Sequence, residues 1–278
     1  MQAILQIELL NHPAIEAGIV PFTLALLLGF ILPNRYTWWS TIVFAITYFF
    51  SAWLILDGRF TPLSSSRKLV MLGAGAVILG FIMPKLISNS KALQRILIVI
   101  AIGATLWLIW PILSRGDVWD QVNLAIGCGI YALWLCFAFF QLRDEDIATS
   151  VSASVLGFAT GICALVGASS LLGELGIAIG ASSAAVALFA LSKRIDHSGG
   201  FYFPITILCT LIAIASAVYA KVPWYVLIAL GAIPLAAMLF EWRYKPGVIR
   251  IIKLGFFTLI PAAVAVVLTW QAAGPVPY

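Results

Sequence analysis

The sequence is divided into ten runs of roughly 20 mostly apolar residues, each bounded by charged residues, proline or tryptophan. A hydrocarbon core about 30 Å thick is crossed by about 20 residues of α-helix, because each residue adds about 1.5 Å. The sequence therefore predicts an all-α, polytopic transmembrane helix bundle of about ten helices, in one integral membrane domain over residues 1–278. The predicted helices cover residues 14–32, 37–56, 69–87, 96–113, 118–140, 147–169, 172–191, 203–220, 223–240 and 248–270.

Hydrophobic residues make up 63% of the chain and charged residues 10%, against about 45–50% and about 25% in soluble domains. Such a chain lacks the polar surface that would cover its apolar residues in water, so a lipid bilayer is its expected partner. The composition excludes a soluble enzyme, a disordered linker, a disulfide-stapled scaffold and a nucleic-acid-binding protein. The four cysteines lie inside apolar runs without CxxC spacing, so neither a zinc site nor a disulfide framework is expected.

One helix boundary is less distinct than the others, because residues 155–191 are almost continuously apolar. A single helix over these 37 residues would be about 55 Å long, nearly twice the thickness of the hydrocarbon core. The segment GASSLLGELG interrupts this stretch. We therefore expect two helices joined by a tight turn within that segment.

Lysine and arginine are distributed unequally between the two sides of the predicted bundle, with 11 on one side and 5 on the other. The positive-inside rule places the richer side in the cytoplasm, so both termini are expected to be non-cytoplasmic. Short loops without a large extramembrane domain favour a bacterial inner (plasma) membrane. The richer side carries Arg35, Lys85, Lys91, Arg95, Arg143, Lys193, Arg194, Arg243, Lys245, Arg250 and Lys253, and the other side carries Arg59, Arg67, Lys68, Arg115 and Lys221.

The first five and the last five predicted helices occupy halves of similar length, residues 1–143 and 144–278. An odd number of helices in each half would make the second half an inverted copy of the first, as in many secondary transporters. The halves share no residue-level identity. Two inverted five-helix halves are therefore a prediction from spacing alone.

Three carboxylates, Glu16, Asp120 and Glu174, are predicted near helix starts on the less basic side of the membrane. Ionisable groups inside a membrane are unfavourable unless they have partners, so each is a candidate for binding a substrate or a proton. One interpretation is an outward-facing vestibule in which the three attract a cation or exchange a proton. The alternative is that each carboxylate only complements the positive end of its helix and reaches interfacial water.

The sixth and seventh predicted helices are rich in small residues and contain two GxxxG pairs, Gly157 with Gly161 and Gly176 with Gly180. Such pairs allow helix backbones to approach closely in lipid, so these four glycines are the predicted helix-packing residues. A face of small residues can also line a cavity, although it more often forms the centre of a bundle.

Several prolines fall inside predicted helices, where each lacks the N–H that would bond to a carbonyl in the preceding turn. The carbonyl groups freed in this way can coordinate ions or allow helix segments to rock, although proline is also simply common in membrane helices. The prolines within or at the ends of predicted helices are Pro21, Pro84, Pro111, Pro234 and Pro261.

Enzyme and metal signatures are missing from the sequence, which contains no HExxH, P-loop or GxSxG motif. The two histidines, His12 and His197, are predicted on opposite sides of the membrane, so a haem pair or a multi-histidine metal site is not expected. We therefore expect a non-enzymatic protein with no catalytic residues, no metal and no cofactor.

The leading functional hypothesis is a multi-pass transporter that moves a small solute, either cationic or coupled to protons. The alternative is a non-catalytic subunit or an assembly or scaffold protein of a larger membrane complex, which would contact a membrane-protein partner or a second copy through its aromatic and glycine-rich faces. A third hypothesis is an intramembrane lipid-modifying enzyme, because Ser169, Ser170, Glu174 and His12 are predicted on the same side of the membrane. Serine near glutamate without a nearby base is, however, weak evidence for nucleophilic catalysis.

Overall fold

The computed structural model describes residues 12–31, 38–58, 61, 63–87, 89–115, 117–192, 200–241 and 248–274. Helices connected by short turns account for nearly all of these residues, and no strand occurs among them. This confirms the predicted all-helical fold class. The helices are η1 (Ile15–Ile19), a π-helical turn that continues into α2 (Val20–Ile31), then α3 (Trp39–Ile55), α4 (Ser65–Leu86), α5 (Ser90–Leu113), α6 (Val118–Gln141), α7 (Asp146–Val166), α8 (Ser170–Ser192), α9 (Tyr202–Tyr219), α10 (Trp224–Glu241) and α11 (Val248–Ala273).

Each predicted run overlaps one observed helix, when η1 and α2 are taken together. The largest difference lies at the start of α5, which begins at Ser90 rather than at residue 96. The additional first turns contain Lys91 and Arg95, so a search for apolar runs passes over them. Asn89 caps this helix, because its side-chain oxygen accepts hydrogen bonds from the backbone N–H groups of Lys91 and Ala92 at 3.0 and 3.4 Å.

Seven of the helices in the described ranges, α4 to α9 and α11, are long and apolar enough to cross a membrane. The other three, α2 with η1, α3 and α10, are apolar but shorter. Large apolar side chains such as Phe30, Ile130, Ile252 and Phe256 are mostly exposed on the outside of the bundle, as expected of a surface in contact with lipid. The chain is therefore a multi-pass membrane protein.

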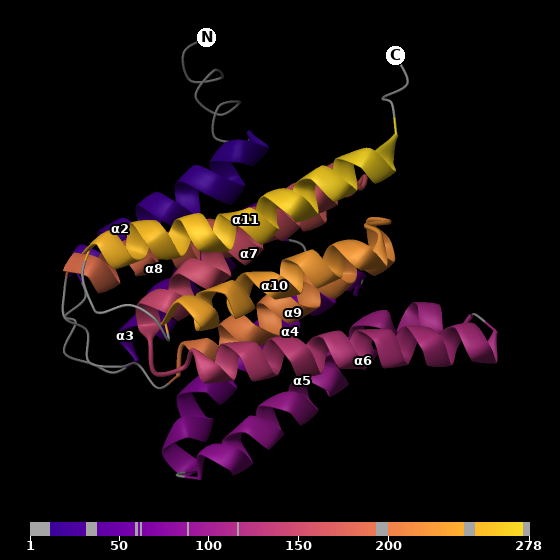
Figure 1. Ribbon diagram of the computed structural model, residues 1–278, viewed down its shortest axis with the longest axis horizontal. Coiled ribbons are helices and arrows are strands. Elements are labelled where there is room, and N and C mark those ends of the chain that lie inside the picture. The colour runs from indigo at the N-terminus through magenta and orange to yellow at the C-terminus, as the bar shows by residue number, and fades with distance from the viewer. Residues whose placement is uncertain are drawn as a thin grey trace.

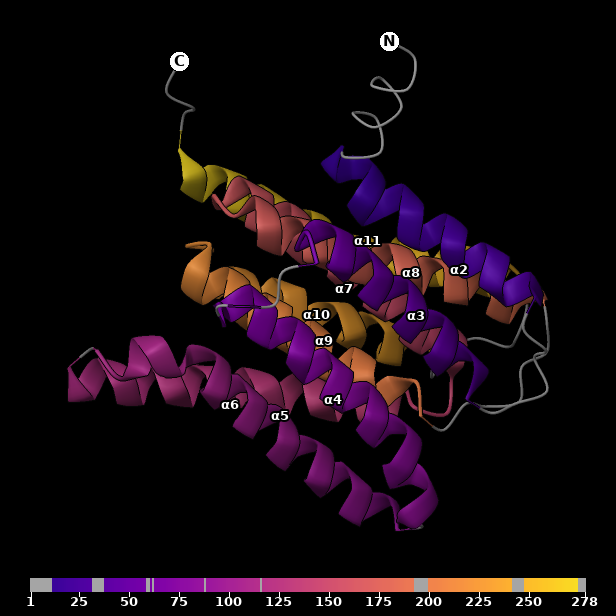
Figure 2. The ribbon, with the colours of Figure 1, turned by 180° about the vertical axis from the view of Figure 1, so that it is seen from behind.

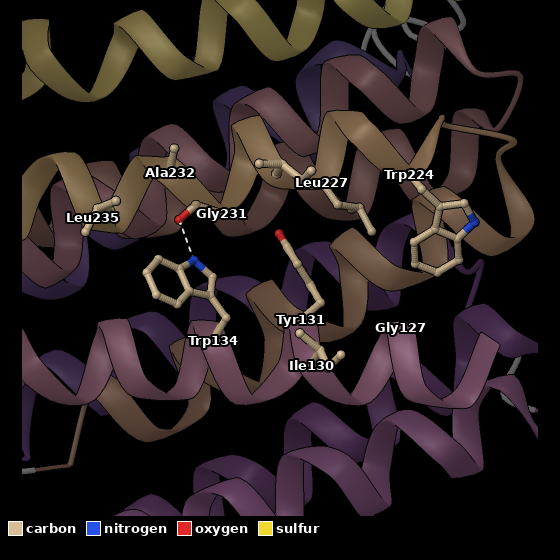
Figure 3. A pocket seen from close by; sticks show the side chains of 10 residues that line it. Gly127, Ile130, Tyr131, Trp134, Trp224, Leu227, Gly231, Ala232 and Leu235 are labelled. Carbon is tan, nitrogen blue, oxygen red and sulfur yellow. Dashed lines mark hydrogen bonds between the residues drawn. The ribbon is translucent and has the colours of Figure 1, made fainter. Parts of the chain in front are cut away.

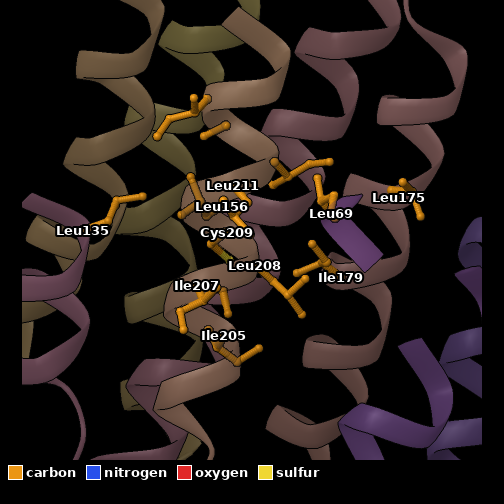
Figure 4. Close-up of a cluster of buried hydrophobic side chains, with 14 of the residues drawn as sticks. Leu69, Leu135, Leu156, Leu175, Ile179, Ile205, Ile207, Leu208, Cys209 and Leu211 are labelled. Carbon is orange, nitrogen blue, oxygen red and sulfur yellow. The ribbon is translucent and has the colours of Figure 1, made fainter. Parts of the chain in front are cut away.

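Helix α9 occupies the centre of the bundle, with α4, α5, α6, α7, α8 and α10 packed around it (Figures 1 and 2). The apolar window of α9 is 89% buried, whereas that of the peripheral α11 is only 28% buried. Leu208 of α9 occupies the space beside Gly73 of α4, where an added Cβ would lie 2.6 Å from Leu208 Cδ2. Figure 4 shows the surrounding core, which includes Leu69, Leu135, Leu156, Leu175, Ile179, Ile205, Ile207 and Leu211.

Successive helices run in opposite directions, so the start of η1 and the end of α11 lie at the same end of the bundle (Figure 1). We call this end the acidic end, because Glu16, Asp57, Asp117, Asp120 and Glu174 lie there beside Arg67, Lys68, Arg115 and Lys221. We call the opposite end the basic end; it carries Lys85, Lys91, Arg95, Arg143 and Lys253 beside Asp144, Glu145 and Asp146.

Helices α7 and α8 are separate, which confirms the expectation of two helices joined by a tight turn. The chain reverses at residues 167–169, where Ala168 adopts a φ of 86°. The four predicted packing glycines lie between the two helices. A Cβ on Gly157 would lie 2.6 Å from the backbone nitrogen of Gly180, and one on Gly176 would lie 2.7 Å from the Cα of Gly161. Only glycine allows the two backbones to approach this closely.

The predicted orientation in the membrane and the predicted inverted repeat both stay predictions. The charge count behind the orientation includes six residues outside the described ranges, namely Arg35, Arg59, Lys193, Arg194, Arg243 and Lys245. The inverted repeat would make α4 the counterpart of α9, yet the apolar window of α4 is only 33% buried. The two halves therefore contribute unequally to the bundle centre.

Candidate functional site

Two of the three predicted carboxylates lie close together at the acidic end. Glu16 in η1 and Glu174 in the first turns of α8 interact electrostatically, and Glu16 interacts in the same way with Asp57 at the end of α3. The side chains of Glu16 and Glu174 are half-buried, and Asp57 is exposed. Nothing in the sequence near Asp57 indicates that it is a neighbour of Glu16.

A proline-induced break explains how the backbone of Glu16 is held. In the π-helical turn the N–H of Val20 bonds to the carbonyl of Ile15, five residues earlier. By the same pattern the carbonyl of Glu16 would bond to residue 21, but Pro21 has no N–H. The hydroxyl of Ser51 in α3 donates a hydrogen bond to that carbonyl instead. A side chain from a neighbouring helix thus satisfies the carbonyl that the proline leaves without a donor.

Asp120 lies apart from the other two carboxylates. It is exposed on the first turn of α6, which packs against α5, α9 and α10, whereas Glu16 and Glu174 lie where η1 meets α8. In both views of the ribbon α6 is on one side of the bundle, with α2 and α8 on the other (Figures 1 and 2). The structure therefore brings Glu16 and Glu174 together and does not bring Asp120 to them.

Asp120 instead stands at the mouth of a groove between α6 and α10. A hollow lined by Asp120, Asn123, Leu124, Gly127 and Trp224 adjoins a second groove, with which it shares Gly127 and Trp224. This second groove has a volume of about 370 Å³ and is almost entirely apolar (Figure 3). We call it the α6/α10 groove; its lining residues are Gly127, Ile130, Tyr131, Trp134, Trp224, Leu227, Ile228, Gly231, Ala232 and Leu235.

Trp134 and Gly231 connect the two walls of the α6/α10 groove. The indole N–H of Trp134 donates a 2.9 Å hydrogen bond to the backbone carbonyl of Gly231 (Figure 3). A Cβ on Gly231 would lie 3.1 Å from the indole nitrogen, so glycine is what allows the ring to lie against α10. Pro234 interrupts the helical hydrogen bonding in this same turn of α10, because it provides no N–H for the carbonyl of Leu230.

Tyr131 provides a polar group in the otherwise apolar wall. Its side chain extends from α6 toward α10 (Figure 3), and its hydroxyl is buried without a hydrogen-bond partner among the described residues. A buried hydroxyl that makes no hydrogen bond is unfavourable by about 1–3 kcal/mol. A ligand or water molecule in the groove could supply the missing bond.

The charges around the mouth of the groove are mixed. Asp117 and Asp120 extend from the start of α6, Arg115 from the α5–α6 turn, and Lys221 from the turn before α10, and all four are exposed. Of these, only Asp120 lines the hollow. It lies there with Trp224, and a carboxylate and an aromatic face are the two groups that recognise organic ammonium ions.

Metal-binding chemistry is not supported by the part of the chain that the structure describes. No group of three or more histidine, cysteine, aspartate or glutamate side chains gathers there in a way that could hold a metal ion. All four cysteines are free and buried in the helix core. His197, which is predicted on the opposite side of the membrane from His12, lies outside the described residues.

The sequence matches no family model, and no curated protein is significantly similar to it.

Proposed function

We propose that this multi-pass membrane protein is a non-enzymatic transporter of an amphipathic organic cation, and that the α6/α10 groove is its binding site. The observation that supports this proposal most strongly is that Asp120 and Trp224 lie at the mouth of the apolar α6/α10 groove. A solute with a cationic head and an apolar body complements both parts. The positive-inside orientation would open this mouth on the non-cytoplasmic side of a bacterial inner membrane.

The pair formed by Glu16 and Glu174 supports a second, coupling role. Two carboxylates that interact across a helix contact repel one another, and a proton or a cation bound between them relieves that repulsion. The two side chains belong to different elements, so occupation of the pair would change how η1 packs on α8. We propose that Glu16 and Glu174 bind the coupling ion, and that Asp120 binds the cationic head of the solute.

Uptake into proteoliposomes tests the proposal, with radiolabelled benzyltrimethylammonium, which has a cationic head and an apolar ring, as the probe. We expect saturable uptake above that of protein-free vesicles. Replacing Asp120 with asparagine should reduce uptake about fivefold, the equivalent of about 1 kcal/mol for a partly exposed ion pair. The matched control is Asp117→Asn, which removes a charge three residues away from a side chain that does not line the hollow.

A second pair of variants tests the groove itself. Ala232→Trp places a large side chain in the groove, and we expect it to abolish uptake. Ala263→Trp adds the same side chain on the exposed face of α11 and should leave uptake unchanged. Uptake equal to that of empty vesicles, or equal effects of the two tryptophan variants, would contradict the proposal and favour a non-transporting membrane subunit.

A further inference from the structure

A second pocket lies at the basic end of the bundle, away from the α6/α10 groove. It is formed where the turn between α4 and α5 meets the turn after α6 and the first residue of α9. Its volume is about 210 Å³, about seven times the roughly 30 Å³ that one water molecule occupies in the liquid. Its lining is Pro84, Ile87, Ser90, Leu93, Arg143, Asp144 and Tyr202, and we call it the Arg143 pocket.

Tyr202 lines this pocket, and its buried hydroxyl has no hydrogen-bond partner among the described residues. The side chain is only 2% exposed, and its ring packs edge-on against Phe140 with the ring centres 5.9 Å apart. Its hydroxyl is close enough to Arg143 and Asp144, the two charged residues of the lining, to interact with both electrostatically. A buried hydroxyl is normally hydrogen-bonded, and no acceptor for this one lies in the described ranges.

Arg143 provides a positioned cation beside that hydroxyl. Its guanidinium carbon lies 4.2 Å from the centre of the Phe140 ring, and its Nη1 donates to the Phe140 carbonyl at 3.5 Å. Its Nη2 lies 3.4 Å from Oδ2 of Asp144, whose side chain is 74% exposed. Both polar contacts are long, and a solvent-exposed ion pair holds its partners weakly. Arg143 lines the pocket, and these two contacts engage its guanidinium N–H donors only weakly.

The surroundings of the pocket are also cationic. Lys85 lies in the last turn of α4, and Lys91 and Arg95 lie in the first turns of α5, all exposed. The start of α5 adds the positive end of a 24-residue helix, although Asn89 already accepts hydrogen bonds from two of its first N–H groups. Ser90 supplies an exposed hydroxyl to the lining. Asp144 and the neighbouring Glu145 and Asp146 oppose this charge only in part.

We infer that the Arg143 pocket binds a phosphate group, of the kind carried by an anionic phospholipid headgroup or by free inorganic phosphate. The Arg143 guanidinium would pair with the phosphate oxygens, and the hydroxyls of Tyr202 and Ser90 would donate hydrogen bonds to them. The apolar residues Pro84, Ile87 and Leu93 would contact the carbon atoms of an esterified headgroup. Basic pockets between transmembrane helices commonly hold lipid phosphates on the cytoplasmic side, which is where the positive-inside rule places this end. This inference does not depend on the transport proposal.

Binding to the detergent-purified full chain tests the inference in two arms. One arm measures retention of phosphatidylglycerol, with phosphatidylcholine for comparison, by native mass spectrometry. The other measures binding of radiolabelled inorganic phosphate. Tyr202→Phe removes only the hydroxyl, and Arg143→Gln removes the charge; we expect each to weaken binding about tenfold or more, as for a hydrogen bond to a charged group.

Two control variants separate a specific site from general attraction. Tyr225→Phe removes an exposed hydroxyl of α10, and Arg115→Gln removes an exposed charge at the acidic end, so both should bind like the unmodified chain. Binding of phosphatidylglycerol alone that is sensitive to Tyr202→Phe identifies a headgroup site, and binding in both arms identifies a phosphate site open to small molecules. Absence of binding in both arms, or binding that Tyr202→Phe leaves unchanged, would overturn the inference. Thermal midpoints without ligand show whether each variant is folded.

Discussion

Replacing Gly157 with alanine should separate α7 from α8 and destabilise the bundle. The added Cβ would lie 2.6 Å from the nitrogen of Gly180, 2.9 Å from its Cα and 3.0 Å from the carbonyl oxygen of Gly176. All three are backbone atoms and cannot rotate away. Because non-bonded carbon contacts are favourable at about 3.5–4.0 Å, the helices would have to move apart by about 1 Å.

The expected magnitude combines two opposing effects. Forcing extra volume into a well-packed contact typically costs about 1–3 kcal/mol, and contact with rigid backbone favours the upper value. Alanine in place of glycine inside a helix raises the free energy of unfolding by about 1 kcal/mol, because alanine has the higher helix propensity. The net loss of stability is therefore about 2 kcal/mol, which for a chain of this size lowers Tm by about 4–8 °C.

A thiol-reactive fluorescent dye can follow this unfolding in detergent, because all four cysteines are buried in the folded chain. The matched control is Gly103→Ala in α5, where an added Cβ would meet nothing within 4 Å. Its Tm should be unchanged or raised by up to about 4 °C. A Tm for Gly157→Ala equal to or above that of the unmodified chain would refute the argument that the two backbones are in direct contact.

Two further substitutions test hydrogen bonds that link different helices. Ser51→Ala leaves the carbonyl of Glu16 without a donor and should lower stability by about 1–3 kcal/mol, measured by the same dye. Its control is Ser216→Ala, because the hydroxyl of Ser216 bonds to the Ile212 carbonyl of the same helix and its loss should be nearly neutral. Trp134→Phe keeps an aromatic ring but removes the donor to Gly231, and should cost about 1 kcal/mol, or about 2–4 °C in Tm. A Ser51→Ala midpoint no lower than that of Ser216→Ala, or an unchanged Tm for Trp134→Phe, would contradict these assignments.

The helices of the described ranges could be predicted from the sequence because a bilayer crossing needs a run of roughly 20 apolar residues. The division of residues 155–191 into α7 and α8 followed from the same constraint, since one helix would have been too long. The start of α5 was predicted too late, because its polar first turn lies outside the apolar run and is stabilised by the Asn89 cap.

The neighbours of each helix could not be predicted in the same way. Helices that are apolar on every side lack the periodic pattern that identifies the buried face of a helix in a soluble protein. Trp134 and Gly231 are 97 residues apart, and nothing in the sequence near either residue indicates that they form a hydrogen bond. For the same reason Glu16, Asp120 and Glu174 could be assigned to one side of the membrane but not to one cluster or two.

The role of the prolines became clear only from the packing. Pro21 leaves the carbonyl of Glu16 without its helical donor, and Ser51 supplies one. Pro111 likewise provides no N–H for the carbonyl of Trp107, to which the ammonium group of Lys68 donates at 3.5 Å while lying 5.2 Å from the centre of the indole ring. In both breaks a side chain from another helix replaces the missing bond.

Photo-crosslinking with a diazirine-bearing alkylammonium ion tests the central claim, that the α6/α10 groove holds an amphipathic cation. We predict that labelled peptides come from residues 127–134 and 224–235, that excess unlabelled alkylammonium prevents the labelling, and that Asp120→Asn weakens it while Asp117→Asn does not. Labelling spread over the exposed face of α11, insensitive to competitor and to Asp120→Asn, would contradict the claim.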